Sequence, residues 1–143
     1  MSGVQDAGVV ERFDPFDGAL GLSLATRVGS LVYTSGMVGF DGETGSVPED
    51  LEDEIRLLFA NLANILESAG TSFDHVLEQT NFLVGDPAVV YPIFQKVRTE
   101  VFAGRLPAST SVFVASLLGG HCEVKLVAAL PKGELAATRG MPE

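Results

Sequence analysis

The stretch LPASTSVFVASLLGGHCEVKLVAAL, residues 106–130, contains two alternating apolar segments separated by a glycine pair. This pattern predicts two β-strands, over 109–117 and 121–130, paired as a hairpin that turns at Gly119-Gly120. Apolar side chains occupy both alternating positions of these strands, so both faces of this part of the sheet are expected to be covered.

The chain before this stretch predicts further strands and two helices. Alternating apolar residues within 20–40 predict a strand, a turn and a second strand. Apolar residues three and four positions apart predict a helix over 51–69, and alternation over 75–84 predicts another strand. A second helix is predicted within 85–102, where an aspartate and a proline mark its start.

This order of elements predicts an α+β fold, in which a mixed sheet carries both helices on one face. No further helix is predicted to cover the opposite face, so we expect other copies of the chain to cover it in a homo-oligomer. We expect residues 1–18 to form an N-terminal arm, residues 19–130 to form the α+β domain and residues 131–143 to form a C-terminal tail.

Composition and charge argue against several classes of function. The 143 residues include 9 Lys and Arg against 19 Asp and Glu, and the net charge of −10 disfavours a nucleic-acid partner. No apolar run of about 18 residues predicts a membrane span. The single cysteine and the lack of a secretion signal predict a cytoplasmic protein. One cysteine and two histidines without ligand spacing predict no metal site.

Four segments stand out: LVYTSGMVGFDGETGSVPEDLEDEIRLLFANLANILESAG, HVLEQTNFLVGDPAVVYPIFQKV, LPAST and CEVKLVAA. Together these segments resemble the YjgF/RidA family of reactive intermediate deaminases. The resemblance implies a chorismate-mutase-like fold and a homotrimer with a small-molecule cleft at each subunit interface. It also implies hydrolysis of enamines and imines of 2-amino acids without a cofactor.

The resemblance further implies roles for individual residues. Glu123 matches the glutamate that positions the attacking water, and Ser35-Gly36 match a serine-glycine pair of the family. Gln95 stands where the family has an asparagine on the second helix, and Glu54 stands where glutamine is common. Ser109 stands where the family has the arginine that binds the substrate carboxylate, so the chain departs from the pattern there.

The departure at Ser109 leaves two interpretations open, because serine cannot supply the bidentate fork of arginine. Either the substrate lacks the carboxylate, or another cation reaches the cleft, for which Arg27, Arg98 and Arg105 are the candidates. Ser111 shares a strand face with Ser109 by alternation, and we expect both to line the pocket. Simple packing at a strand edge is the alternative role for both serines.

Glu123 and His121 are the candidate catalytic residues. A carboxylate in an apolar strand requires a wet pocket or an ion-pair partner at an oligomer rim. In a pocket, Glu123 could orient water and carry a proton to a leaving amine. Alternation puts His121 on the same face as Glu123, where the imidazole could act with it, and the alternative role of His121 is that of a turn residue.

These features predict an enzyme that hydrolyses or tautomerises a reactive enamine, an imine or a related enol in a specialised pathway. The alternative is a non-catalytic trimer of the same fold that binds a small ligand or regulates through it, because one fold supports many functions. Whether Glu123 faces the cleft beside His121 would distinguish the two.

Overall fold

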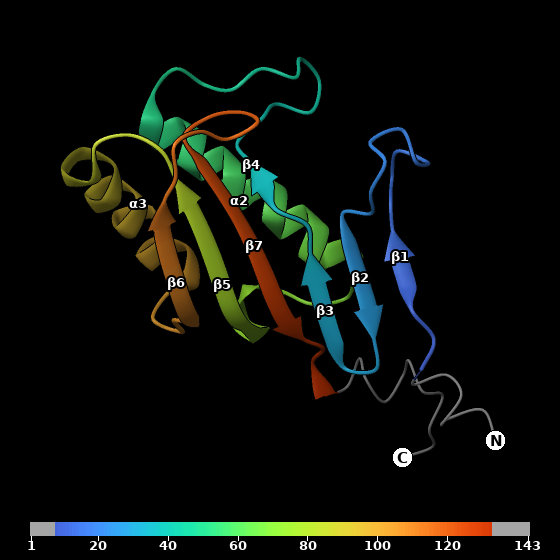
Figure 1. Ribbon diagram of the computed structural model, residues 1–143. Coiled ribbons are helices and arrows are strands. Elements are labelled where there is room, and N and C mark those ends of the chain that lie inside the picture. Colours follow the sequence, from blue (N-terminus) through green and yellow to red (C-terminus); the bar gives the residue numbers. More distant parts are fainter. Residues whose placement is uncertain (1–7, 133–143) are drawn as a thin grey trace.

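The computed structural model describes residues 8–132 and has two layers, a sheet and two helices packed on one of its faces (Figure 1). The sheet has the order β1-β2-β3-β7-β5-β6, and β4 also pairs with β7. This arrangement confirms the predicted α+β architecture. The elements are β1 (Glu11–Phe13), β2 (Ala25–Val28), β3 (Leu31–Thr34), β4 (Met37–Val38), α2 (Leu51–Ser68), a 3-10 turn (Phe73–His75), β5 (Val76–Leu83), α3 (Pro87–Phe102), β6 (Ala108–Phe113) and β7 (Cys122–Ala129).

The last two strands do not form the predicted hairpin, because β5 lies between them, parallel to β6 and antiparallel to β7 (Figure 1). Helix α3 connects β5 to β6, and a helical crossover makes the two strands parallel. The connection from β6 to β7 is held at the end of β5 by hydrogen bonds from Val114 N to Leu83 O (2.8 Å) and from Val84 N to His121 O (2.9 Å). Alternation within two successive strands cannot reveal that a third strand lies between them.

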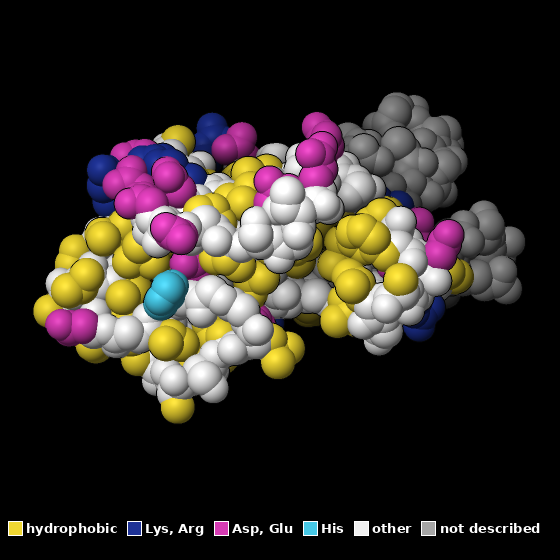
Figure 2. All heavy atoms as spheres, turned by 90° about the horizontal axis from the view of Figure 1, so that it is seen from above, with side chains coloured by type: hydrophobic (Ala, Val, Ile, Leu, Met, Phe, Trp, Pro, Cys, Tyr) yellow, Lys and Arg dark blue, Asp and Glu magenta, His cyan; other side chains and the backbone are white. Residues whose placement is uncertain are grey.

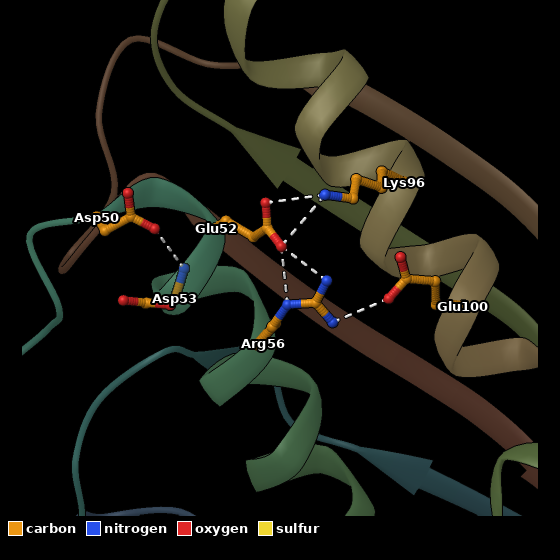
Figure 3. Close-up of polar contacts among 6 residues, drawn as sticks. All are labelled: Asp50, Glu52, Asp53, Arg56, Lys96 and Glu100. Carbon is orange, nitrogen blue, oxygen red and sulfur yellow. Dashed lines mark hydrogen bonds and ion pairs between the residues drawn. The ribbon is translucent and has the colours of Figure 1, made fainter.

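Both helices begin at aspartate N-caps. The Asp50 side chain accepts a hydrogen bond from Asp53 N at 3.0 Å (Figure 3), and the Asp86 side chain accepts one from Ala88 N at 3.0 Å. Helix α3 continues through Pro92, whose missing N–H removes one hydrogen bond near the start of the helix.

The core lies between the helices and the sheet. The ring of Phe59 on α2 packs against Phe94 and Phe102 on α3, with ring centroids 5.9 and 6.2 Å apart. Val124 and Leu126 of β7 belong to the same buried cluster. Because alternate residues of a strand face opposite sides, this packing directs Glu123 and Lys125 to the face away from the helices.

Four charged side chains link α2 to α3 on the surface (Figure 3). Glu52 lies 2.7 Å from Arg56 and 3.2 Å from Lys96, and Arg56 also lies 3.0 Å from Glu100. Acidic and basic side chains gather in one mixed cluster on the surface in Figure 2. Hydrogen bonds from Arg56, and then from Lys96, lower the pKa of Glu52, so its carboxylate stays ionised. The cluster is therefore balanced in charge and orients the two helices.

The sheet face opposite the helices carries exposed apolar side chains. Tyr33 is 43% exposed and Val112 is 41% exposed. Strand pairing adds further residues to this face, which we call the open face: Thr26, Thr80, Phe82, Thr110, Glu123, Lys125 and Val127. Within residues 8–132, neither helix is long and apolar enough to span a membrane.

Within the predicted N-terminal arm, residues 11–13 form β1 and pair with β2. Arg27 of β2 holds this edge strand through Glu11 at 2.9 Å and also donates to Ala69 O at 2.8 Å. A strand of three residues is too short for alternation to reveal it. Of the predicted C-terminal tail, residues 133–143 lie outside the described residues.

Candidate functional site

Glu123 lies on the open face of β7, between Val38 of β4 and Phe82 of β5 in the strand register. Its side chain is half-buried, and its carboxylate lies over Gly36 so closely that a Cβ at that position would overlap it. No Lys, Arg or His within residues 8–132 forms an ion pair with this carboxylate. In the part of the chain that the structure describes, Glu123 is therefore an unpaired carboxylate.

Ser35 fixes the backbone that passes beneath Glu123. Its hydroxyl donates to Ser23 O at 2.6 Å, and its N–H donates to Leu24 O at 2.8 Å. The Ser35 side chain is thus engaged by the backbone, while Gly36 leaves the space that the carboxylate fills. The structure brings Ser35, Gly36 and Glu123 together.

His121 does not pair with Glu123, and the interpretation from alternation is wrong on this point. His121 lies before the first residue of β7, and its ring Nδ1 is 2.9 Å from Oε1 of Glu54. The backbone N–H groups of His121 and Cys122 donate to Oε2 of the same carboxylate. Alternation does not apply to His121 because this residue belongs to the connection between strands.

Glu54 is fully buried on α2, and hydrogen bonds with two backbone N–H groups and the His121 ring replace the water that burial removes. Gly39 and Gly120 approach it so closely that a Cβ at either position would overlap its atoms. Glu54 thereby joins the first turn of α2 to the start of the strand that carries Glu123.

Cys122 is not a nucleophile in this site. Burial, with a smaller contribution from the charge of Glu54, raises the pKa of the Cys122 thiol to about 12. The thiol therefore stays protonated near neutral pH, and the thiolate is the reactive form of cysteine.

Ser109 and Ser111 form a second polar group, on the helix side of the edge strand β6. Asn81 of β5 donates from Nδ2 to the Ser109 hydroxyl at 3.0 Å and to the Ser111 hydroxyl at 2.9 Å. Glu123 lies on the other face of the sheet, so a single chain does not bring the two serines to Glu123.

Arg98 of α3 reaches this group. Its Nη1 donates to Ser109 Oγ at 3.1 Å, and its Nη2 donates to the Tyr91 hydroxyl at 3.1 Å. Gln95 is exposed one turn before Arg98, and among the described residues its side chain makes no hydrogen bond. Arg98 is thus the α3 residue that contacts Ser109, and Tyr91 holds the Arg98 guanidinium.

The sequence analysis does not name Asn81 or Tyr91, and it names Glu54 without a structural role. Glu54 shares the apolar stripe of α2, where a carboxylate is a signal of a buried polar contact. Asn81 stands on the strand face that is buried, and an amide there is a similar signal. Tyr91 lies seven positions before Arg98, a spacing that puts both on one side of a helix.

A separate cavity of about 200 Å³ opens between α2 and the β1–β2 side of the molecule. Its lining is mostly apolar and includes Phe13, Leu24, Met37 and Ile65. None of the candidate site residues lines it, so it is distinct from both polar groups.

The fold and these groups define a class of small α+β chain whose open sheet face presents a glutamate that has no ion-pair partner among the described residues. The sequence profile of the family described as Endoribonuclease L-PSP matches residues 16–130. The RutC family protein YjgH of Escherichia coli is 36% identical over 111 residues, covering 77% of this chain and 83% of the relative. The 2-iminobutanoate/2-iminopropanoate deaminase of Mus musculus is 34% identical over 110 residues, covering 74% and 78%.

Among solved structures, the yeast protein YEO7 superposes with a TM-score of 0.78 and 26% identity, covering 86% of this chain and 100% of that one. The chain belongs to the family of Endoribonuclease L-PSP, also known as YjgF/RidA.

Proposed function

We propose that the chain is a cofactor-free hydrolase of a small enamine or imine. The observation that carries the proposal is the unpaired, half-buried carboxylate of Glu123 over Gly36. Relatives named as deaminases of 2-imino acids and reactive intermediates support this class of substrate. The net charge of −10 opposes binding of an RNA backbone.

In the proposed reaction, the substrate reacts as the protonated iminium, and Glu123 accepts a proton from water as the water oxygen forms a bond to the iminium carbon. The resulting neutral carbinolamine loses ammonia when Glu123 returns the proton to the nitrogen, the carbon–nitrogen bond breaks and the hydroxyl proton passes to solvent as the C=O bond forms. The products are a carbonyl compound and ammonia, and the carboxylate ends in its starting state. Each half-reaction needs a positioned group that can hold one proton.

We propose a homotrimer as the active assembly, because Glu123 and the serines of β6 occupy opposite faces of one chain. A cleft between two chains could unite one protomer's Glu123 with its partner's β6. The exposure of Tyr33 and Val112 on the open face supports such an interface, as does Leu118 in the connection before β7, which is 105% exposed.

The proposal is tested by turnover of 2-iminobutanoate, formed in solution by an amino-acid oxidase acting on 2-aminobutanoate. We expect the protein to accelerate release of the 2-oxo acid and ammonia, and we expect Glu123→Gln to lower the rate by roughly a hundredfold or more. The control is Glu67→Gln, an exposed carboxylate on α2.

The Glu123→Gln protein should keep the melting temperature of the wild type, because the amide is nearly isosteric. A variant with full activity would contradict the role of Glu123. Binding of substrate analogues without any turnover of imines or enamines would favour the non-catalytic ligand-binding trimer.

A further inference from the structure

Three arginines can be compared as partners for a substrate anion. Arg27 is bound to the Glu11 carboxylate at 2.9 Å, and Arg105 lies 3.2 Å from the Asp74 carboxylate. Among the described residues, Arg98 has no carboxylate partner, and its two hydrogen bonds go to the neutral hydroxyls of Ser109 and Tyr91. Within residues 8–132, no carboxylate therefore neutralises the positive charge of Arg98.

The guanidinium of Arg98 is nevertheless held in one place. Its central carbon lies 5.4 Å from the centroid of the Phe94 ring and 5.6 Å from that of Tyr91. Contacts of a cation with two aromatic rings, together with the two hydrogen bonds, fix the plane of the fork. A guanidinium has five N–H donors, so donors remain for a ligand.

The neighbouring hydroxyls also have donors to spare. Ser109 Oγ accepts from Asn81 Nδ2 at 3.0 Å and from Arg98 Nη1 at 3.1 Å. A hydroxyl has two acceptor sites and one donor, so the remaining hydrogen of Ser109 is free to donate elsewhere. Ser111 Oγ likewise accepts from Asn81 at 2.9 Å. Asn81 is fully buried, and its Oδ1 has no partner among the described residues, which marks this group as incomplete.

We propose that Arg98, Ser109 and Ser111 form the subsite for a carboxylate on the substrate. The inference rests on the proposed function, and what it adds is the residue of this chain that binds the substrate carboxylate. The Arg98 guanidinium comes from helix α3 and contacts Ser109, which stands at the strand position of the family's arginine. A positive charge is therefore present near this position, although a helix supplies it instead of the strand. A planar carboxylate matches a planar fork with a hydroxyl donor beside it.

The binding experiment compares 2-oxobutanoate with the uncharged 2-oxobutanamide by calorimetry on the assembled protein. We expect Arg98→Gln to weaken 2-oxobutanoate by roughly tenfold to a hundredfold, the usual range for a hydrogen-bonded charge, and to leave 2-oxobutanamide unchanged. Arg105→Gln is the matched control and should bind both probes as the wild type does. Unchanged binding of 2-oxobutanoate to Arg98→Gln would overturn the subsite, and so would an equal loss for both probes.

A second variant, which moves the arginine from α3 to β6, separates loss of the subsite from a folding defect. The double change Arg98→Gln with Ser109→Arg returns the guanidinium to the strand, and we expect it to regain at least part of the affinity for 2-oxobutanoate. Failure to regain any affinity, in a variant with a normal melting temperature, would count against the subsite.

Turnover separates this inference from the proposed function. If the wild type and Arg98→Gln turn over 2-iminobutanoate at equal rates, the carboxylate subsite is overturned, whereas the proposed hydrolase function stands. Arg98-dependent binding without any turnover would support the subsite and overturn the hydrolase.

Discussion

The imidazole of His121 and the buried carboxylate of Glu54 lie 2.9 Å apart, although 67 positions separate the two residues in the chain. Together with the backbone N–H groups of His121 and Cys122, this contact fixes the start of β7 against α2. The position of Glu123, two residues further along the chain, therefore depends on a helix residue that never reaches the open face.

Replacing Glu54 by alanine should lower the free energy of unfolding by about 2 to 4 kcal/mol, because two buried N–H groups lose their acceptor. His121→Ala should lower the free energy of unfolding by less than about 1 kcal/mol, because the ring is half-exposed and water can take its place beside the Glu54 carboxylate. Urea unfolding at pH 7 measures both changes. Equal stability of Glu54→Ala and the wild type would contradict the structural role of Glu54.

Gly36→Ala should reduce turnover strongly while changing stability little. The added Cβ would overlap the carboxylate of Glu123, and a flexible side chain can move aside at small cost. Gly42→Ala is the control, because a Cβ there meets no atom within 4 Å. Steady-state rates and melting curves of both variants are the measurements. A Gly36→Ala protein with wild-type turnover would show that the position of Glu123 does not matter.

The thiol of Cys122 makes stability fall at high pH. Its pKa is raised from 9.0 to about 12 in the fold, so above pH 9 the unfolded chain loses a proton that the folded chain keeps. The contribution of Cys122 should thus be fully present below pH 9 and decline by about 1 kcal/mol per pH unit above it. Urea unfolding of the wild type and Cys122→Ala at pH 8 and pH 10 gives the difference. A stability gap that is the same at both pH values would refute the raised pKa.

The trimer should depend on the apolar part of the open face. Val112→Glu puts a charge on that face and should release single chains at micromolar concentration, as measured by sedimentation equilibrium. Val89→Glu is the matched control, because Val89 is 55% exposed but lies on α3. A wild-type protein that sediments as a single chain would exclude the proposed assembly.

The periodic parts of the chain are the parts that sequence analysis predicts well. The apolar stripe of α2, the caps Asp50 and Asp86 and the alternation of β5 all depend on neighbours within a few residues. Long-range pairing is different: the position of β5 between β6 and β7 follows from the crossover through α3, which no local pattern encodes.

The same distinction between local pattern and long-range packing applies to the residues of the candidate site. Glu123, Ser35 and Gly36 are found together because they lie in adjacent elements of the sheet. The partner of His121 is a residue of α2, and the charged partner of Ser109 is a residue of α3, so both contacts depend on how the helices pack. Helix packing is decided by the whole core, which explains why neither contact could be foreseen.

The turn between α3 and β6 carries a further consequence. Ala103 and Gly104 both adopt left-handed backbone angles, with φ of 49° and 86°, and they set where β6 begins against β5. One residue added or lost in this turn would move the serines to the opposite face and bring Thr110 into their place. The length of the turn between α3 and β6 therefore determines which side chains of β6 face the ligand, as much as the identity of those side chains does. Relatives that differ in the length of this turn would differ in ligand specificity.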